Sequence, residues 1–183
     1  MKLHEVDGLL AGMFVLKPTI YTDERGSFFE SWNKRDFSRL TNVDLDFVQD
    51  NSSLSCCGVL RGLHYQIVAP QGKLVSAVTG AIYDVAVDLR RSSPTFGQWF
   101  GIELSDENKL QLWIPPGFAH GFLVRSSFAQ VNYKTTDYYF PEHERCISWA
   151  DPSLGIQWGQ QGAPILSSKD SVGTSFDRAD FYK

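Results

Sequence analysis

Short segments in which apolar and polar residues alternate fill the middle of the chain. In residues 81–90, AIYDVAVDLR, the odd-numbered positions from 83 to 89 hold Tyr, Val, Val and Leu, and the even-numbered positions between them hold Asp, Ala and Asp. A period of two predicts a half-buried β-strand. The β-rich segment 72–80 ends at a predicted turn, Thr79-Gly80, so we expect the two segments to form a hairpin. Further strands are predicted over 98–104, 110–115, 120–126 and 129–140.

Helical periodicity is scarce. Residues 33–40, NKRDFSRL, predict two helical turns, and Ser105 predicts a cap for one further turn. The apolar run 8–16 is flanked by acidic residues and by Lys17-Pro18, so we expect a first strand there rather than a secretion signal. Many short strands separated by Gly, Pro and Asn predict a β-sandwich or barrel. We expect one jelly-roll-like domain over residues 1–183 with a polar pocket at its open end.

Composition narrows the classes of function. The 183 residues are 43% hydrophobic and 14% aromatic, and the formal net charge is -4. That charge argues against nucleic acid as a partner, because affinity for a phosphate backbone comes from clustered Lys and Arg. No apolar run approaches the roughly 20 residues of a membrane span, so we expect a cytoplasmic protein with no membrane contact. The three cysteines, Cys56, Cys57 and Cys146, form neither a disulfide framework nor a zinc motif, and we expect reduced thiols.

The stretch GVLRGLHYQ, residues 58–66, places an arginine and a histidine inside an apolar strand pattern. Strict alternation would send Arg61 and His64 to opposite faces. For the two to act in one site, a bulge or bend around Gly62 must redirect one of them. Taken singly, His64, Lys73, His120, Tyr133 and Asp170 each have an ordinary structural explanation, and spacing alone does not assign them a function.

The sequences of longer segments, and their order along the chain, indicate a family. The chain resembles the dTDP-4-dehydrorhamnose 3,5-epimerase family from about Gly12 to Asp170. The matching segments are DERGSFFES (23–31), FVQDN (47–51), GVLRGLHYQ (58–66), QGKLV (71–75), DVAVDLRRSSPTFGQW (84–99), LWIPPGFAHGFLV (112–124), YKTTDYY (133–139), PEHER (141–145) and PILSSKD (164–170). The resemblance implies an all-β, cupin-like jelly roll, also called a double-stranded β-helix, with a few short helices. The tail 171–183 matches no family pattern and has no assigned role.

The resemblance implies a cofactor-independent isomerase that uses no metal. Its substrate is dTDP-4-dehydro-6-deoxy-D-xylo-hexose, whose C4 ketone acidifies the hydrogens on C3 and C5. His64 resembles the family's base, and Asp170 resembles the carboxylate that orients it. Lys73 is similar to the lysine that stabilises charge on the sugar oxygen, and Tyr133 resembles the acid that returns a proton to the opposite face.

The remaining matches imply substrate-binding positions. Arg25 and Arg61 fit the pyrophosphate, because a guanidinium group suits paired phosphate oxygens. Phe28 and Tyr139 are candidates for contacts with the sugar and thymine. Polar matches around the nucleotide or the sugar are Glu30, Gln49, Asp50, Asn51, His120, Glu144 and Lys169. In the family, the stretch from Arg25 to Glu30 reaches a neighbouring subunit by strand exchange, which implies a homodimer.

Three alternatives remain open at this point. A metal-dependent cupin would explain Pro115, Gly117 and His120, but the sequence lacks the His-x-His and Glu motif that supplies most of the ligands. A non-catalytic sugar-nucleotide-binding jelly roll would keep the arginines without needing the base, lysine, tyrosine and aspartate together. A mono-epimerase acting at C3 or C5 alone, on a related dTDP-4-ketosugar, would share most of these residues.

Overall fold

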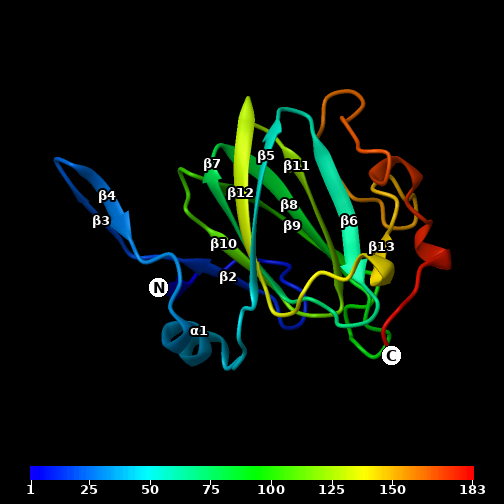
Figure 1. The fold of residues 1–183 in the computed structure, drawn as a ribbon, viewed down its shortest axis with the longest axis horizontal. Coiled ribbons are helices and arrows are strands. Elements are labelled where there is room, and N and C mark those ends of the chain that lie inside the picture. Colours follow the sequence, from blue (N-terminus) through cyan, green and yellow to red (C-terminus); the bar gives the residue numbers. More distant parts are fainter.

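Two antiparallel β-sheets form the body of the molecule. The computed structural model describes residues 1–183. One sheet has six strands in the order β1 (Lys2–Leu3), β2 (Phe14–Lys17), β10 (Gln111–Ile114), β7 (Lys73–Thr79), β12 (Phe128–Thr135) and β5 (Gln49–Cys56). The other has five strands in the order β13 (Glu144–Cys146), β6 (Leu60–Gln66), β11 (Phe118–Val124), β8 (Ala81–Asp88) and β9 (Trp99–Ser105). The two sheets face each other as the halves of a jelly roll (Figure 1), so the predicted fold class is confirmed.

The largest apolar cluster lies between the two sheets. Val75 and Val131 contribute from the six-stranded sheet, and Ala86 and Phe122 from the five-stranded one. A second cluster covers the outer face of the five-stranded sheet, where Val85, Val87 and Leu89 pack against residues near the C-terminus. Both faces of this sheet are therefore buried, and its polar inward-facing residues mark the site described below.

The helical expectation near residue 33 is confirmed. Helix α1 (Lys34–Thr41) begins after Asn33, whose side-chain oxygen accepts the backbone N–H of Asp36 at 3.2 Å. It ends at Asn42 in the left-handed region, and its buried Phe37 packs on Trp113 at the outer face of the six-stranded sheet. No helix of this fold has the length and apolar character needed to cross a bilayer.

Three local expectations differ from the structure. The predicted hairpin is wrong, because β7 and β8 belong to different sheets and the turn at Gly80 carries the chain from one to the other. Ser105 ends β9 and begins a turn rather than a helix, in which the Ser105 hydroxyl accepts the Asn108 N–H at 3.1 Å. In the apolar run 8–16, only its end from Phe14 lies in a strand, while Gly8, Ala11 and Gly12 lie in turns.

A two-stranded arm leaves the body of the protein. It consists of β3 (Ile20–Asp23) and β4 (Gly26–Phe29), which pair only with each other. Figure 1 shows the arm, in blue, extending beyond the two sheets. The burial of its residues is slight, and the Phe28 side chain is 72% exposed. The arm is therefore an apolar and charged hairpin that is largely exposed, and only Phe29 at its base lies near the body of the chain, with its ring 5.7 Å from the Lys109 ammonium.

The C-terminal segment is ordered against the five-stranded sheet. It contains the single-turn 3-10 helices η2 (Asp170–Val172) and η3 (Phe176–Arg178), and a third such turn, η1 (Pro141–His143), precedes β13. The Phe181 ring lies 5.1 Å from the rings of both Phe96 and Phe176. The Tyr65 hydroxyl donates to the backbone oxygen of Asp180 at 2.9 Å. The tail, to which the sequence assigned no role, thus completes the outer core behind β6.

Candidate active site

Polar residues from both sheets converge on a cavity at one end of the barrel. Two adjoining hollows of about 410 and 300 Å³ share His64, Lys73 and Tyr133 among their lining residues. His64 comes from β6 of the five-stranded sheet, whereas Lys73 and Tyr133 come from β7 and β12 of the six-stranded sheet. A larger hollow of about 580 Å³ lies on the outer face of the six-stranded sheet and contains no histidine, so it is a different feature.

A β-bulge brings Arg61 and His64 to the same face. On β11, Phe122 pairs with Arg61 and His120 pairs with His64, so three steps on β6 oppose two steps on β11. The extra residue lies beside Gly62, which has a φ of +107° and no room for a side chain, since a Cβ would lie 2.5 Å from the backbone oxygen of His120. Arg61 and His64 therefore both line the cavity, as the sequence-based expectation of a bulge required.

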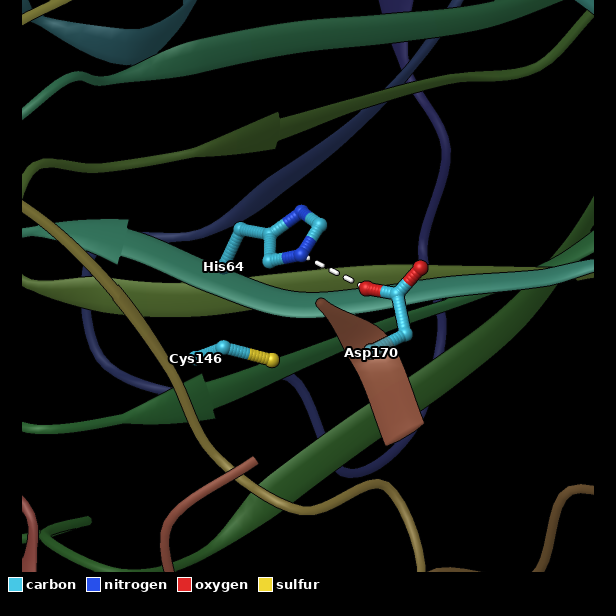
Figure 2. Close-up of side chains that lie close together, drawn as sticks. All are labelled: His64, Cys146 and Asp170. Atoms are coloured by element: carbon cyan, nitrogen blue, oxygen red, sulfur yellow. Dashed lines mark ion pairs between the residues drawn. The ribbon is translucent and has the colours of Figure 1, made fainter. Parts of the chain in front are cut away.

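His64 is paired with a buried carboxylate. Its Nε2 atom lies 2.7 Å from Oδ1 of Asp170, and Figure 2 shows the other ring nitrogen pointing away from the carboxylate. The carboxylate lies close to the imidazole, although no partner of Nε2 meets hydrogen-bond geometry. A carboxylate at this distance favours the proton on Nε2, which leaves the lone pair of Nδ1 as the basic site.

Asp170 is held in its ionised form. The Gly62 N–H donates to Oδ1 at 3.1 Å and the Ser167 hydroxyl donates to Oδ2 at 2.6 Å. Burial alone would raise the pKa of Asp170, but the adjacent His64 and these two donors lower the pKa to about 2. The side chain is 3% exposed, so a full negative charge faces the imidazole in a site largely shielded from water.

A second histidine–aspartate pair lies beside Lys73. His120 Nε2 lies 2.9 Å from the nearer oxygen of Asp84, and both residues are buried. Burial lowers the pKa of Lys73 to about 8 despite the opposing charges of Asp84 and Glu144. Burial also lowers the pKa of His120, with Asp84 opposing the effect. Asp84 is a residue that the sequence did not assign to the site, and the signal was its place on the inward-facing side of the strand pattern at 81–90.

Tyr133 faces the cavity from the opposite sheet. It pairs with Val75 on β7 and with Asn51 on β5, which fixes its direction toward the space between the sheets. Burial raises the pKa of its hydroxyl, and the positive charge of Arg61 offsets only part of that effect. The hydroxyl therefore stays protonated at neutral pH and is available as a proton donor.

The predicted substrate-binding residues fall into two groups. Those that line the two hollows are Arg61, His120, Lys169, Gln49, Asn51, Tyr139 and Glu144. Glu144 links two of them, because its carboxylate accepts the Tyr139 hydroxyl at 2.7 Å and also contacts the Lys169 ammonium. The linked side chains lie at the rim of the cavity, where Tyr139 is 45% exposed.

The other predicted positions lie elsewhere in this chain. Arg25, Phe28 and Glu30 belong to the arm or follow it, and the Arg25 guanidinium pairs with Asp23 on the same hairpin. Asp50 is on the outer face of β5, since alternation turns it away from Gln49 and Asn51, and it pairs with Lys134 at 2.9 Å. None of the four lines the cavity, and for Asp50 the strand alternation itself is the reason.

Comparison with known proteins assigns a family. A family profile described as dTDP-4-dehydrorhamnose 3,5-epimerase matches residues 8–178. A dTDP-4-dehydrorhamnose 3,5-epimerase of Pseudomonas aeruginosa is 58% identical over 93% of this chain and 94% of its own length. A crystal structure of a dTDP-6-deoxy-D-glucose-3,5-epimerase from Legionella pneumophila, in complex with dTDP-4-keto-L-rhamnose, is 48% identical, with a TM-score of 0.94 over 98% of this chain and 94% of its own.

A more distant relative has a narrower activity. A 3'-monoepimerase from Streptomyces bikiniensis, in complex with dTDP-quinovose, is 32% identical, with a TM-score of 0.86 over 94% of this chain and 86% of its own. The fold is thus common to enzymes that invert one or two carbons, and the higher identities belong to the double epimerases. On the extent of these matches and on the geometry of the cavity, the chain belongs to the dTDP-4-dehydrorhamnose 3,5-epimerase family.

Proposed function

We propose that the protein epimerises C3 and C5 of dTDP-4-dehydro-6-deoxy-D-xylo-hexose to give dTDP-4-dehydro-L-rhamnose. The observation that carries the proposal is the origin of the two proton-transfer groups. His64 enters the cavity from the five-stranded sheet and Tyr133 enters it from the six-stranded sheet. A hexose ring bound between the sheets therefore meets a base on one side and an acid on the other, which is what inversion at carbon requires.

The first half of the reaction is proton abstraction by His64. The C4 ketone acidifies the neighbouring C–H bonds, since the electron pair left on carbon delocalises onto the carbonyl oxygen. Nδ1 of His64 takes the proton, and the resulting imidazolium is stabilised by the Asp170 carboxylate at Nε2. The Lys73 ammonium is a buried cation in the wall of the cavity and would stabilise the charge on the enolate oxygen. Such a donor typically contributes about 2.7–4 kcal/mol in a dry site.

The second half is proton return by Tyr133. The enolate collapses to the ketone as the carbon accepts a proton from the phenol on the opposite side of the ring, so the configuration inverts. The tyrosinate then recovers its proton from solvent, and His64 releases its own. The high pKa of Tyr133 keeps the proton in place until a carbanion-like carbon is presented. Neither half of this sequence needs a redox step.

The substrate's nucleotide tail has cationic partners along the cavity. Arg61 lies at the cavity wall, where its Nε atom donates to the Ser55 hydroxyl at 3.1 Å, and its remaining N–H groups are suited to paired phosphate oxygens. Tyr139 at the rim offers an exposed ring face for the thymine or the sugar. Lys169 adds a positive charge beside it.

Deuterium exchange tests the reaction. The protein is incubated with the 4-ketosugar nucleotide in D₂O, and C3 and C5 are followed by NMR. The proposal predicts deuterium at both carbons together with the inverted product. Exchange and inversion at a single carbon would instead establish a mono-epimerase, and no exchange at either carbon would refute the proposed activity.

A homodimer with exchanged arms completes the proposal. The arm pairs with no other strand of its own chain, and Arg25, Phe28 and Glu30 all lie on it or next to it. The outer face of the six-stranded sheet exposes Leu54, at 68%, and Phe128, at 49%, which suits it to contact a second copy. In such a dimer, Arg25 from one chain would reach the pyrophosphate bound in the cavity of the other chain.

Subunit mixing tests the exchanged arm. Arg25→Ala is expected to be weakly active alone, and His64→Ala is expected to be inactive. In a mixed dimer, one cavity combines an intact His64 with the intact arm of the other chain, so mixing is expected to restore activity well above the sum of the separate variants. If each cavity used its own chain's arm, the mixture would give only that sum.

A further inference from the structure

A cysteine lies beside the His64–Asp170 pair, and the proposed reaction does not use it. The ligand atoms of His64, Cys146 and Asp170 all lie within 4.8 Å of one another. They come from three separate elements, since His64 is on β6, Cys146 ends β13 and Asp170 begins η2. In Figure 2 the Cys146 side chain lies beneath the imidazole, and its sulfur points toward the side on which Asp170 lies. The three side chains therefore converge rather than merely share a neighbourhood.

Their chemistry is that of a metal site. A thiolate, an imidazole and a carboxylate are the three ligand types that Zn²⁺ takes in proteins, and three protein ligands leave a fourth position for water. Two further features suit a metal. The Nε2 atom of His64 is buried and lacks an aligned hydrogen-bond partner. The Asp170 carboxylate is already oriented by the Gly62 N–H and the Ser167 hydroxyl, which is the kind of outer support that metal-ligating carboxylates have.

We propose that His64, Cys146 and Asp170 form a binding site for a thiophilic divalent cation, with zinc as the natural occupant, and that occupation inhibits the enzyme. The inhibitory part rests on the proposed function of His64 as the base. The binding part rests on the cluster alone.

Inhibition follows from the proton balance at the imidazole. Coordination uses the Nε2 lone pair, so the single proton of the neutral ring must be on Nδ1. Nδ1 is the atom that takes the substrate proton in the free enzyme, and once protonated it has no lone pair to do so. The Cys146 thiol gives its proton to solvent and binds as the thiolate, and Asp170 binds as the carboxylate that it already is. No oxidation or reduction takes place.

Two factors limit the affinity. Ligand atoms around a tetrahedral zinc lie about 3.3–3.8 Å apart, given bonds of about 2.0–2.3 Å. The cluster must therefore contract at its widest separation, and the 2.7 Å contact between Nε2 of His64 and Oδ1 of Asp170 must open. Burial also raises the pKa of the Cys146 thiol to about 12, and the cation must displace that proton. We therefore expect a reversible, micromolar site rather than a permanently filled structural one.

Cadmium binding tests the site without reference to activity. A thiolate bound to Cd²⁺ gives an ultraviolet charge-transfer band that a titration follows directly. Because the exposed Cys56 and Cys57 would also bind Cd²⁺, the reference protein is the full chain with Cys56→Ser and Cys57→Ser. In this reference protein we expect the band to saturate at one equivalent of Cd²⁺ per chain and to disappear when Zn²⁺ displaces the Cd²⁺. Adding Cys146→Ser should abolish the band, and adding His64→Gln should weaken Cd²⁺ binding at least tenfold.

The inhibitory part is tested on the same proteins. Of these, the reference protein and Cys146→Ser, which both keep the base His64, are assayed for epimerisation with and without Zn²⁺, and the ratio is compared within each protein, so that any change in basal activity cancels. Inhibition of the reference should follow the occupancy measured by Zn²⁺ displacement of Cd²⁺, and Cys146→Ser should raise the inhibitory concentration at least tenfold. Circular dichroism establishes whether each variant is folded. If Cys146→Ser does not fold, the Cd²⁺ titration of His64→Gln tests the binding site in its place.

The outcomes separate the two claims. A reference protein that gives no charge-transfer band, or a band that His64→Gln leaves at full affinity, would overturn the site. A band without inhibition would overturn the inhibitory part. A band in a protein that shows no exchange at C3 or C5 in metal-free buffer would leave the metal site standing and would remove the proposed epimerase function instead.

Discussion

Asp170→Asn is the substitution that isolates the role of the carboxylate behind His64. It keeps the size of the side chain and an oxygen to accept the Gly62 N–H, and the Ser167 hydroxyl can reverse its hydrogen bond. What it removes is the negative charge 2.7 Å from Nε2. That charge favours the tautomer with a basic Nδ1 and stabilises the imidazolium formed during proton abstraction.

The magnitude follows from the contact. A hydrogen bond or close contact to a charged group contributes about 1.5–3 kcal/mol, and each 1.36 kcal/mol of lost transition-state stabilisation is tenfold in rate. We therefore expect kcat to fall about 10- to 150-fold. KM should change little, because Asp170 is behind the histidine and its own partners are protein atoms. Steady-state kinetics with the 4-ketosugar nucleotide measures both constants.

Asp151→Asn provides the matched control. Asp151 is also a buried carboxylate, and it accepts N–H groups from Ser153 and Phe176 outside the cavity. Its replacement should affect the free energy of unfolding and leave kcat within about twofold of the wild type. If Asp170→Asn also kept kcat within twofold while remaining folded, the carboxylate would not be assisting His64, and the assignment of the pair would be refuted.

Three further perturbations have defined outcomes. Burial lowers the pKa of Lys73 to about 8, so kcat/KM should fall as the pH rises through that value and the cation is lost. Lys73→Arg should move this fall in kcat/KM to higher pH. A pH–rate profile without such a fall would contradict the role of the Lys73 cation. Gly62→Ala should lower the free energy of unfolding by about 2–4 kcal/mol in denaturant titrations. Gly26 has a similar φ but open space around it, so Gly26→Ala should lower the free energy of unfolding by less. Equal losses for the two variants would mean that the close approach of Gly62 to β11 does not matter. Phe181→Ala should lower the free energy of unfolding by about 1–3 kcal/mol through its lost aromatic contacts. Val172 is 77% exposed, so Val172→Ala should leave the free energy of unfolding almost unchanged. A stability unchanged by Phe181→Ala would mean that the tail does not support the sheet.

Alternation predicted most of the strands but not their partners. The pattern at 81–90 identified β8 because each face of that strand meets a different apolar cluster. The same pattern is silent about which sheet a strand joins, and this is why the hairpin with β7 was wrong. A turn such as Thr79-Gly80 reverses the chain equally well within a sheet and between two facing sheets.

Some features of the site could likewise be predicted from the sequence, and others could not. The need for a bulge at Gly62 could be inferred, because a base and a phosphate ligand three residues apart cannot share a regular strand face, and the register confirms it. The inclusion of Asp50 came from segment matching, and alternation from Gln49 and Asn51 already placed it on the other face. Asp84 and Cys146 were missed, because their approach to the histidines depends on strands paired across the sheet rather than on spacing along the chain.

The tail illustrates what no local pattern reveals. Residues 171–183 contain no long apolar run, yet Phe176, Phe181 and Tyr182 pack behind the strand that carries His64. Their burial is created by the five-stranded sheet and by the aromatic ring of Phe96, which is distant in sequence. A short aromatic tail becomes core only when the rest of the fold provides a surface for it.

The claim that a base and an acid act from opposite sheets is tested most directly by Tyr133→Phe in D₂O. Without the phenol, His64 can still remove a proton and return a deuteron to the same side. We predict that Tyr133→Phe exchanges hydrogen at carbon with retention of configuration while epimerisation falls at least 100-fold, and that His64→Ala abolishes both processes. Tyr133→Phe that epimerises at the wild-type rate, or His64→Ala that still exchanges its substrate's hydrogens, would contradict the account.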